Sequence, residues 1–216
     1  MNKLLIKYVI FLTGTWLIFG CNEPDFVGSD TLVTLDRQLP AFTSIEVSTD
    51  LEVKISKGAQ QQVKVTSNDN LSEQLKTVVS NGQLAIELES GSYDDATFIV
   101  EIQLPELELL ELNDNTRANL AFDNERMSII VKGSSTAEIS GNTDALNTEV
   151  RDNGTIRGFQ YTARQVNTQS RDASLLEINC VEQLSGSVNQ AAEVIYTGSP
   201  TLNISQSENG RVRKLN

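Results

Sequence analysis

Two pairs of oppositely charged residues are the strongest candidates for chemistry in this sequence. Arg151-Asp152 and Arg171-Asp172 recur about 20 residues apart. If the fold stacks them on neighbouring turns, they form a mixed-charge patch, which could bind a ligand or supply the acid and base groups of a polysaccharide hydrolase or lyase. A solvated ladder of surface charges explains the same residues, and each of its pairs contributes less than about 1 kcal/mol. We favour the ladder and keep the patch as the alternative.

The residue types that the sequence lacks narrow the chemistry further. It contains no histidine, which excludes His-based catalytic triads and His metal ligands. Of its two cysteines, we expect Cys180 to be a small buried hydrophobic residue rather than a reactive thiol. No phosphate-binding loop, dinucleotide fingerprint or EF-hand-like loop is present. We therefore expect no cofactor, no metal site and no enzymatic activity, and leave open whether acidic corners bind Ca²⁺.

The composition is that of a globular, acidic protein. The chain has 216 residues, of which 39% are hydrophobic and 21% charged, enough for one substantial domain. Its formal net charge is −12, and an acidic surface repels nucleic-acid phosphates. We expect no nucleic-acid partner.

Residues 1–20 have the pattern of an export signal. Lys3 and Lys7 precede an apolar run over residues 9–19, which is too short to span a bilayer core of about 30 Å. The run ends at Gly20-Cys21, which resembles a bacterial lipobox. The resemblance implies cleavage before Cys21 and acylation of its thiol, so that a lipid anchor makes the membrane a partner. We expect an exported protein anchored in the cell envelope, at the outer membrane and exposed at the surface; an ordinary signal peptide is the alternative.

The next segments are predicted to be a polar tether over 21–41 and β-hairpins over 42–106. Apolar residues alternate with polar ones in several short runs after residue 42, which favours strands. Asn81-Gly82 is a strong hairpin-turn signal because both residues tolerate positive φ. Only residues 70–78 have apolar residues at helical spacing.

A repeat of about 19 residues begins near Pro105 and predicts a β-solenoid over 107–216. Short polar residues mark it at Asn115, Ser134, Asn153, Asp172, Gln190 and Asn209. A repeat this short cannot bury a core alone and must stack on its neighbours. In this register Val131 and Ile156 face the core, whereas Glu138 and Arg157 face solvent. Val166 and Leu184 fall out of register, and Tyr161 lies beneath Cys180.

Several motifs together resemble one known family. They are Phe42-x-x-Ile45-x-Val47, Leu84-x-Ile86, Leu104-Pro105-x-Leu107, Tyr196-x-Gly198-x-Pro200 and Asn209-Gly210. The chain is similar to the family called putative auto-transporter adhesin, head GIN domain, from about Phe42 to the C-terminus. The resemblance implies an exported or lipid-anchored protein with a β-solenoid-like fold, of a kind common in Bacteroidetes.

The fold class expected is therefore all-β: a single-stranded, right-handed β-helix-like solenoid preceded by β-hairpins. For the function we expect a lipid-anchored, non-catalytic module of the cell envelope, with a binding, adhesion-like or structural role. Its ligand would be an envelope protein or a polysaccharide, and the oligomeric state is not predicted. The alternative is a carbohydrate-active enzyme that uses carboxylates on the solenoid face. A groove with at least two carboxylates and an arginine would favour the enzyme, and a flat surface with dispersed charges the module.

Overall fold

The computed structural model describes residues 25–207 and 209–215. The N-terminal strands are β1 (Phe26–Val27), β2 (Leu32–Asp36), β3 (Ser44–Ser48), β4 (Glu52–Lys57), β5 (Gln62–Asn68), β6 (Leu75–Ser80), β7 (Gln83–Leu88), β8 (Tyr93–Asp94) and β9 (Phe98–Leu104). The later strands are β10 (Leu109–Asn113), β11 (Arg117–Ala121), β12 (Asn124–Val131), β13 (Thr136–Val150), β14 (Thr155–Ser170), β15 (Leu175–Val188), β16 (Glu193–Thr197), β17 (Thr201–Gln206) and β18 (Arg211–Lys214).

The regular elements of the described residues are strands, as predicted, and the only helical element among them is the 3₁₀ turn η1 (Asp69–Leu71). The helical spacing over residues 70–78 was therefore misleading, because β6 starts at Leu75 and pairs antiparallel with β7. The connecting turn, Asn81-Gly82, has φ values of 51° and 78°, as the hairpin prediction required. In the part of the chain described, no helix is long and apolar enough to cross a membrane.

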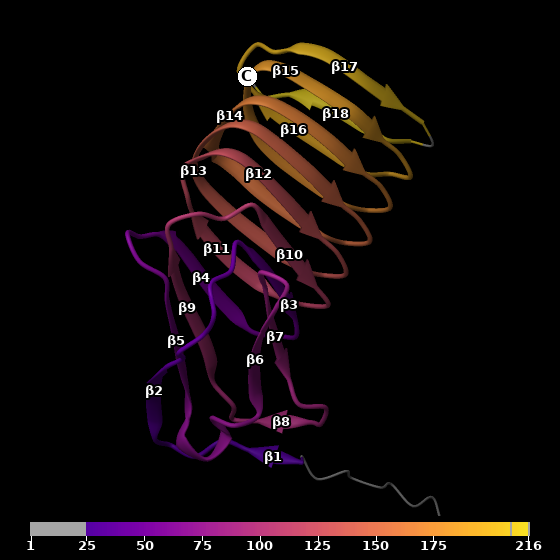
Figure 1. The fold of residues 1–216 in the computed structure, drawn as a ribbon. Coiled ribbons are helices and arrows are strands. Elements are labelled where there is room, and N and C mark those ends of the chain that lie inside the picture. The colour runs from indigo at the N-terminus through magenta and orange to yellow at the C-terminus, as the bar shows by residue number, and fades with distance from the viewer. Residues whose placement is uncertain (1–24, 208, 216) are drawn as a thin grey trace, which may run out of the picture.

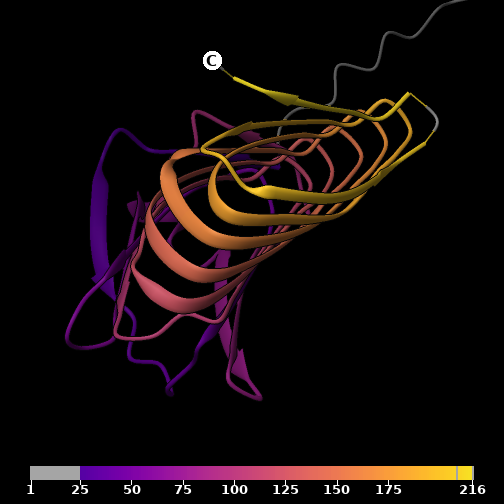
Figure 2. The same cartoon turned by 90° about the horizontal axis from the view of Figure 1, so that it is seen from above.

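The strands wind into a β-solenoid with two faces, and Figures 1 and 2 show its rungs stacked around a common interior. The first face has the strand order β6-β7-β3-β10-β12-β13-β14-β15-β17. The second face has the order β2-β5-β9-β4-β11-β13-β14-β15-β16-β18. The long strands β13, β14 and β15 pass round a corner, so each belongs to both faces. The solenoid prediction is confirmed.

The parallel ladder extends further towards the N-terminus than the repeat indicated. Strand β3 pairs with β10, and β4 pairs with β11, both in parallel register. The boundary expected between residues 106 and 107 therefore does not interrupt the ladder. Beyond it, β6 extends the first face as a hairpin with β7, whereas β5 extends the second face by antiparallel pairing with β9, which is distant in the sequence.

The tether predicted over residues 21–41 is wrong for its described part, because residues from Asp25 onward pack against the body of the protein. Strand β2 pairs antiparallel with β5, and β1 pairs with β8. The buried Asn68 amide donates to the Ser29 carbonyl at 2.6 Å, and its oxygen accepts from the Thr97 amide at 2.7 Å. The segment lies along β5, where it satisfies backbone groups that an open sheet edge would expose.

Alternating side chains from both faces fill the interior. Val131 and Ile156 are both 0% exposed, whereas Glu138 and Arg157 are exposed, so the predicted inward and outward positions are confirmed. Because alternate residues of a strand point to opposite sides, the same register that buries these apolar rows presents rows of polar side chains outside.

The length of the rung varies, and a strict step of 19 residues is wrong for the later rungs. Thr155 pairs with Leu175 at a step of 20, and Leu175 pairs with Glu193 at a step of 18. Irregularities in the register absorb these differences. As a result Val166 and Leu184, which a strict step puts out of register, pair with each other and are buried.

The chain passes from the first face to the second at a corner where one residue per rung has the left-handed backbone conformation. We call this corner the left-handed corner. These corner residues have φ between 62° and 68° and are Asp114, Gly133, Asp152, Asp172, Ala191 and Asn209. Asp, Asn and Gly tolerate this conformation better than other residues. The repeat aligned Asp172 with Asn153, but the longer rung stacks Asp172 on Asp152 instead, where its carboxylate accepts from the Asp152 amide at 3.3 Å.

Candidate functional site

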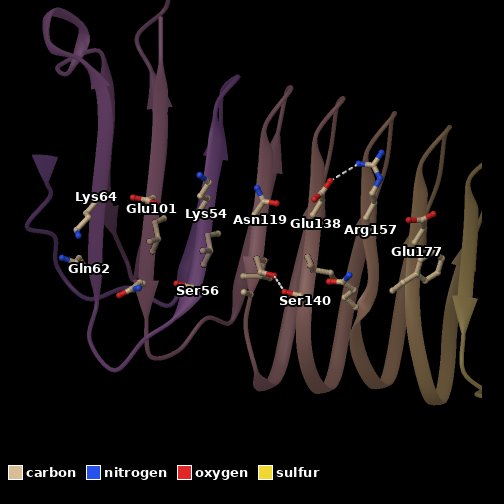
Figure 3. Close-up of a pocket in the computed structure, with 18 residues that line it drawn as sticks. Lys54, Ser56, Gln62, Lys64, Glu101, Asn119, Glu138, Ser140, Arg157 and Glu177 are labelled. Carbon is tan, nitrogen blue, oxygen red and sulfur yellow. Dashed lines mark hydrogen bonds and ion pairs between the residues drawn. The ribbon is translucent and has the colours of Figure 1, made fainter. Parts of the chain in front are cut away.

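An open groove with a volume of about 790 Å³ crosses the second face. Its lining comes from outward-facing side chains of β5, β9, β4, β11, β13, β14 and β15, and Figure 3 shows these side chains on neighbouring strands. Because these strands are in register, residues at equivalent positions form continuous rows across the face. Two such rows and one aromatic residue make up the site.

The first row, which we call the charged row, alternates in sign across the groove. From β5 to β15 it consists of Lys64, Glu101, Lys54, Asn119, Glu138, Arg157 and Glu177. Neighbouring members stand on strands about 4.8 Å apart. Within the row one ion pair forms, between Arg157 and Glu138 at 3.4 Å, and both side chains are more than half exposed. Lys54 pairs outside the row, with Glu52 at 3.6 Å. Among the described residues, Lys64, Glu101 and Glu177 form no ion pair and are open to a ligand that presents charges of its own.

The second row lies two residues from the first along its strands, or three along β14, and carries no charge. It consists of Gln62, Gln103, Ser56, Ala121, Ser140 and Gln160. Ser56, Ala121 and Ser140 have small side chains, which leave space above β4, β11 and β13. These residues therefore form the floor of the groove. Amides and hydroxyls both donate and accept hydrogen bonds, so this row suits a ligand rich in hydroxyl groups.

A β-bulge in β14 places Phe159 in the groove. Glu138 pairs with Arg157 but Ser140 pairs with Gln160, so two residues, Gly158 and Phe159, stand opposite one residue of β13. Gly158 occupies the inward-facing position. A Cβ there would come within 2.8 Å of the Glu177 carbonyl oxygen, so a larger residue would clash. Phe159 is displaced outward and lines the groove, half-buried. Bulges characteristically redirect a side chain in this way.

Sequence reasoning named Glu138 and Arg157 only as outward positions and missed the groove. The charged row joins residues from 54 to 177. Its N-terminal members lie outside the repeat, so the spacing of the repeat could not align them with the later members. One signal was available: Gly158 occupies a core-facing position that is apolar and bulky in the preceding rungs, Leu120 and Ile139. A glycine at such a position often marks a bulge.

The predicted patch of Arg151, Asp152, Arg171 and Asp172 lies at the left-handed corner, outside the groove. Asp152 accepts from the Gly133 amide at 3.3 Å, and Asp172 accepts from the Asp152 amide. Arg171 pairs with Asp172 at 3.0 Å, whereas Arg151 pairs with Glu149 at 3.6 Å. The structure thus brings both aspartates to adjacent rungs, where their carboxylates hydrogen-bond to the corner backbone.

The two other positions of chemical interest are buried. Cys180 is inaccessible, and burial raises the pKa of its thiol, which disfavours the reactive thiolate. Tyr161 is also buried, but Cys180 pairs with Ala163, so the predicted stacking of Tyr161 beneath Cys180 is wrong. The Tyr161 hydroxyl donates to Asn124 at 3.2 Å. Cys21, the predicted lipid attachment site, lies outside the described residues.

Residues 25–207 and 209–215 contain no cluster of three or more acidic or cysteine side chains that could hold a metal ion. The acidic corner residues therefore do not converge on one point in that part of the chain.

Solved structures with the same fold include proteins from Bacteroides and Parabacteroides. One putative adhesin from Bacteroides fragilis has 17% sequence identity and a TM-score of 0.74, with 88% of this chain and 99% of that chain covered. A putative adhesin from Parabacteroides distasonis has 16% identity and a TM-score of 0.57, with 88% and 100% covered. A putative lipid binding protein from the same species has 17% identity and a TM-score of 0.53, with 88% and 99% covered. No curated protein matches the chain.

The family model for the putative auto-transporter adhesin, head GIN domain, matches residues 41–200. That range begins before β3, includes the whole groove and ends before β17. The resemblance inferred from the motifs is thus confirmed, and the chain belongs to the putative auto-transporter adhesin, head GIN domain family.

Proposed function

We propose that this protein is a lipid-anchored, non-catalytic adhesion-like module of the cell envelope, and that its groove binds a polysaccharide with charged substituents. The observation that carries the proposal is the bulge in β14, which sets Phe159 beside the uncharged row and the charged row. An aromatic face next to amides and hydroxyls is the combination that sugar rings require, because their C–H groups pack on the ring while their hydroxyls pair with the amides.

The shape and charge of the groove support a long, charged ligand. The groove crosses seven strands, so an extended chain lying across them would run along the two rows and contact several of their members in turn. Lys64 offers a cation to acidic substituents, as would Lys54 and Arg157 if the ligand displaced their exposed partners Glu52 and Glu138. Glu101 and Glu177 would pair with basic substituents. Electrostatic contacts of this exposed kind favour recognition but weaken in salt.

Anchoring through Cys21 is consistent with the arrangement of the fold. Strand β1, near the start of the described chain, lies at the end of the molecule opposite β17 and β18 (Figure 1). A lipid at Cys21 would hold the hairpin end at the membrane and present the rungs to the surroundings. Multi-chain lipidation gives stable attachment, and family membership supports an envelope or surface location.

A binding comparison tests the groove. The full-length protein in detergent is titrated with charged and neutral polysaccharides, together with Phe159→Ala, Arg157→Ala and the control Val78→Ala, which alters an exposed residue of β6. Phe159→Ala should weaken binding of the charged ligand about tenfold, Arg157→Ala should reduce its salt dependence, and Val78→Ala should leave it unchanged. Unchanged binding by Phe159→Ala, or no binding to any charged polysaccharide, would overturn the proposal.

A second candidate function, a carbohydrate-active enzyme, is favoured by one feature. Glu138 and Glu177 flank Arg157 in the groove, which is the arrangement that sequence reasoning associated with an enzyme. A general acid, however, must stay protonated, usually in an apolar pocket. The Glu138 side chain is 59% exposed and paired with Arg157. If the groove is catalytic, Glu138→Gln with Glu177→Gln should abolish cleavage; if it only binds, wild type should show no cleavage at all.

A further inference from the structure

The first face carries a regular array of uncharged polar side chains over β14, β15 and β17, which we call the uncharged face. Its nine members are Gln165, Asn167, Gln169, Gln183, Ser185, Ser187, Thr201, Asn203 and Ser205. They form three rows of three, because each residue of β14 pairs with one of β15 and each of these with one of β17. Every member has an amide or a hydroxyl group, and all are exposed or half-buried.

The lack of charge is unusual for this protein. The chain has 29 acidic and 17 basic residues, and the second face carries the charged row. A surface without charge is poorly suited to an ionic partner, since it offers nothing to pair with. It is well suited to a partner that has many hydroxyl groups and no charge.

The amide groups of the array are available to such a partner. Four amide side chains make no hydrogen bond among the described residues, namely those of Gln165, Gln169, Gln183 and Asn203. The hydroxyls of Ser185 and Ser205 donate to backbone carbonyls of the neighbouring rung at 3.2 and 3.3 Å. These contacts hold the serines in place and leave their oxygens able to accept hydrogen bonds.

The spacing of the array suits a repeating ligand. Neighbouring strands stand about 4.8 Å apart, and alternate residues along one strand about 6.7 Å apart. The strand spacing is close to the length of one sugar ring, so successive rings of a chain lying across the strands would meet successive members of one row. Since three rows lie side by side, the array offers hydrogen-bonding groups over an area and not only along a line.

We propose that the uncharged face is a second binding site, separate from the groove, and that its ligand is a neutral polysaccharide. Hydroxyl groups of the polysaccharide pair with the side-chain amides and hydroxyls of the array, and ionic contacts contribute nothing. The two faces then differ in ligand class, with charged polysaccharide on the second face and neutral polysaccharide on the first. One molecule can hold both because the faces lie on opposite sides of the solenoid.

Salt dependence and variants on each face test this inference. The full-length protein in detergent is applied to a panel of immobilised neutral polysaccharides (glucans, mannans, galactans and xylans) at about 0.05 M and about 0.5 M NaCl. Ser185→Arg puts a large cation at the centre of the array, and Gln183→Lys is a milder change at its edge. Asn119→Arg, in the groove on the other face, is the matched control. Thermal unfolding of each variant checks that it is folded.

The expected result is retention on at least one neutral polysaccharide that is the same at both salt concentrations. Ser185→Arg should weaken it at least about tenfold, Gln183→Lys should weaken it less, and Asn119→Arg should leave it unchanged. No retention on any neutral polysaccharide, or loss of retention with Asn119→Arg or Phe159→Ala, would overturn the inference. So would concentration-dependent dimers that Ser185→Arg abolishes, because the array would then be a contact between two copies. The groove proposal is decided separately, by charged ligands.

Discussion

Asp152 and Asp172 illustrate how a residue that looks chemical can have a backbone role. Both have positive φ, at 62° and 63°, and both accept hydrogen bonds from main-chain amides of the corner. Their spacing could be predicted from the sequence because the rungs stack. Their conformation could not be assigned beforehand, since an aspartate in a charged patch and one in a left-handed corner have the same sequence signature.

The corner role predicts a clear difference between two substitutions. Asp152→Val should lower the free energy of unfolding by about 1–2 kcal/mol, because a β-branched residue is strained at positive φ. Asp152→Gly should lower it much less, because glycine adopts this conformation freely. Urea unfolding of both variants and the wild type measures the difference. Equal losses in the two variants would show that aspartate is needed at position 152 for its carboxylate and not for its backbone conformation.

Tyr161 should make stability depend on pH in the alkaline range. Burial raises its pKa to about 12, whereas an unfolded tyrosine titrates near about 10. The folded state favours the neutral phenol, so this stabilisation is complete below about pH 10 and is lost as the pH rises through about 12. From about pH 8 to about pH 11, wild type should lose about 1 kcal/mol more than Tyr161→Phe. Urea unfolding at both pH values measures this loss; Cys180 titrates in both proteins and cancels. Equal losses would contradict a buried Tyr161 phenol.

At the scale of elements, alternation and the repeat predicted the strands and the stacking, but not the bulge that forms the groove. The alternation of apolar residues can be read from a single rung. The one-residue register shift in β14 becomes visible only when β13 lies beside it. The strands that complete the groove, β5 and β9, pair antiparallel with each other. Long-range pairing of this kind leaves no periodic signal, and for the same reason the packing of β1 and β2 against the body was missed.

The register of the rungs predicts which side chains contribute to stability. Val131→Ala and Ile156→Ala should each cost on the order of 1–4 kcal/mol, because both side chains are fully buried between the faces. Glu138→Ala and Arg157→Ala should each cost no more than about 0.5 kcal/mol, as for ordinary exposed positions. Chemical denaturation of the four variants makes the comparison. Similar losses in both pairs would mean that the inward and outward assignments are wrong.

At the scale of the whole molecule, membrane attachment is predicted to depend on a single thiol. Cys21→Ser should move the protein from the membrane fraction to the soluble fraction or leave it unprocessed, because acyl chains on Cys21 are proposed to provide the attachment. Fractionation of cells that express wild type and variant shows the result. Cys180→Ser is the control, since Cys180 is buried in the rungs and should not affect the fraction in which the protein is found. A membrane fraction unchanged by Cys21→Ser would refute the anchor.

The central proposal is that the groove binds its ligand without cutting it. The most direct measurement is the chain length of a charged polysaccharide after prolonged incubation with the full-length protein that retains it, with Glu138→Gln, Glu177→Gln as the control. We predict that the polysaccharide is retained, that its length distribution is unchanged, and that no new reducing ends or unsaturated products form. Shortened chains with the wild type, and intact chains with the double variant, would contradict the account and identify the groove as a catalytic site.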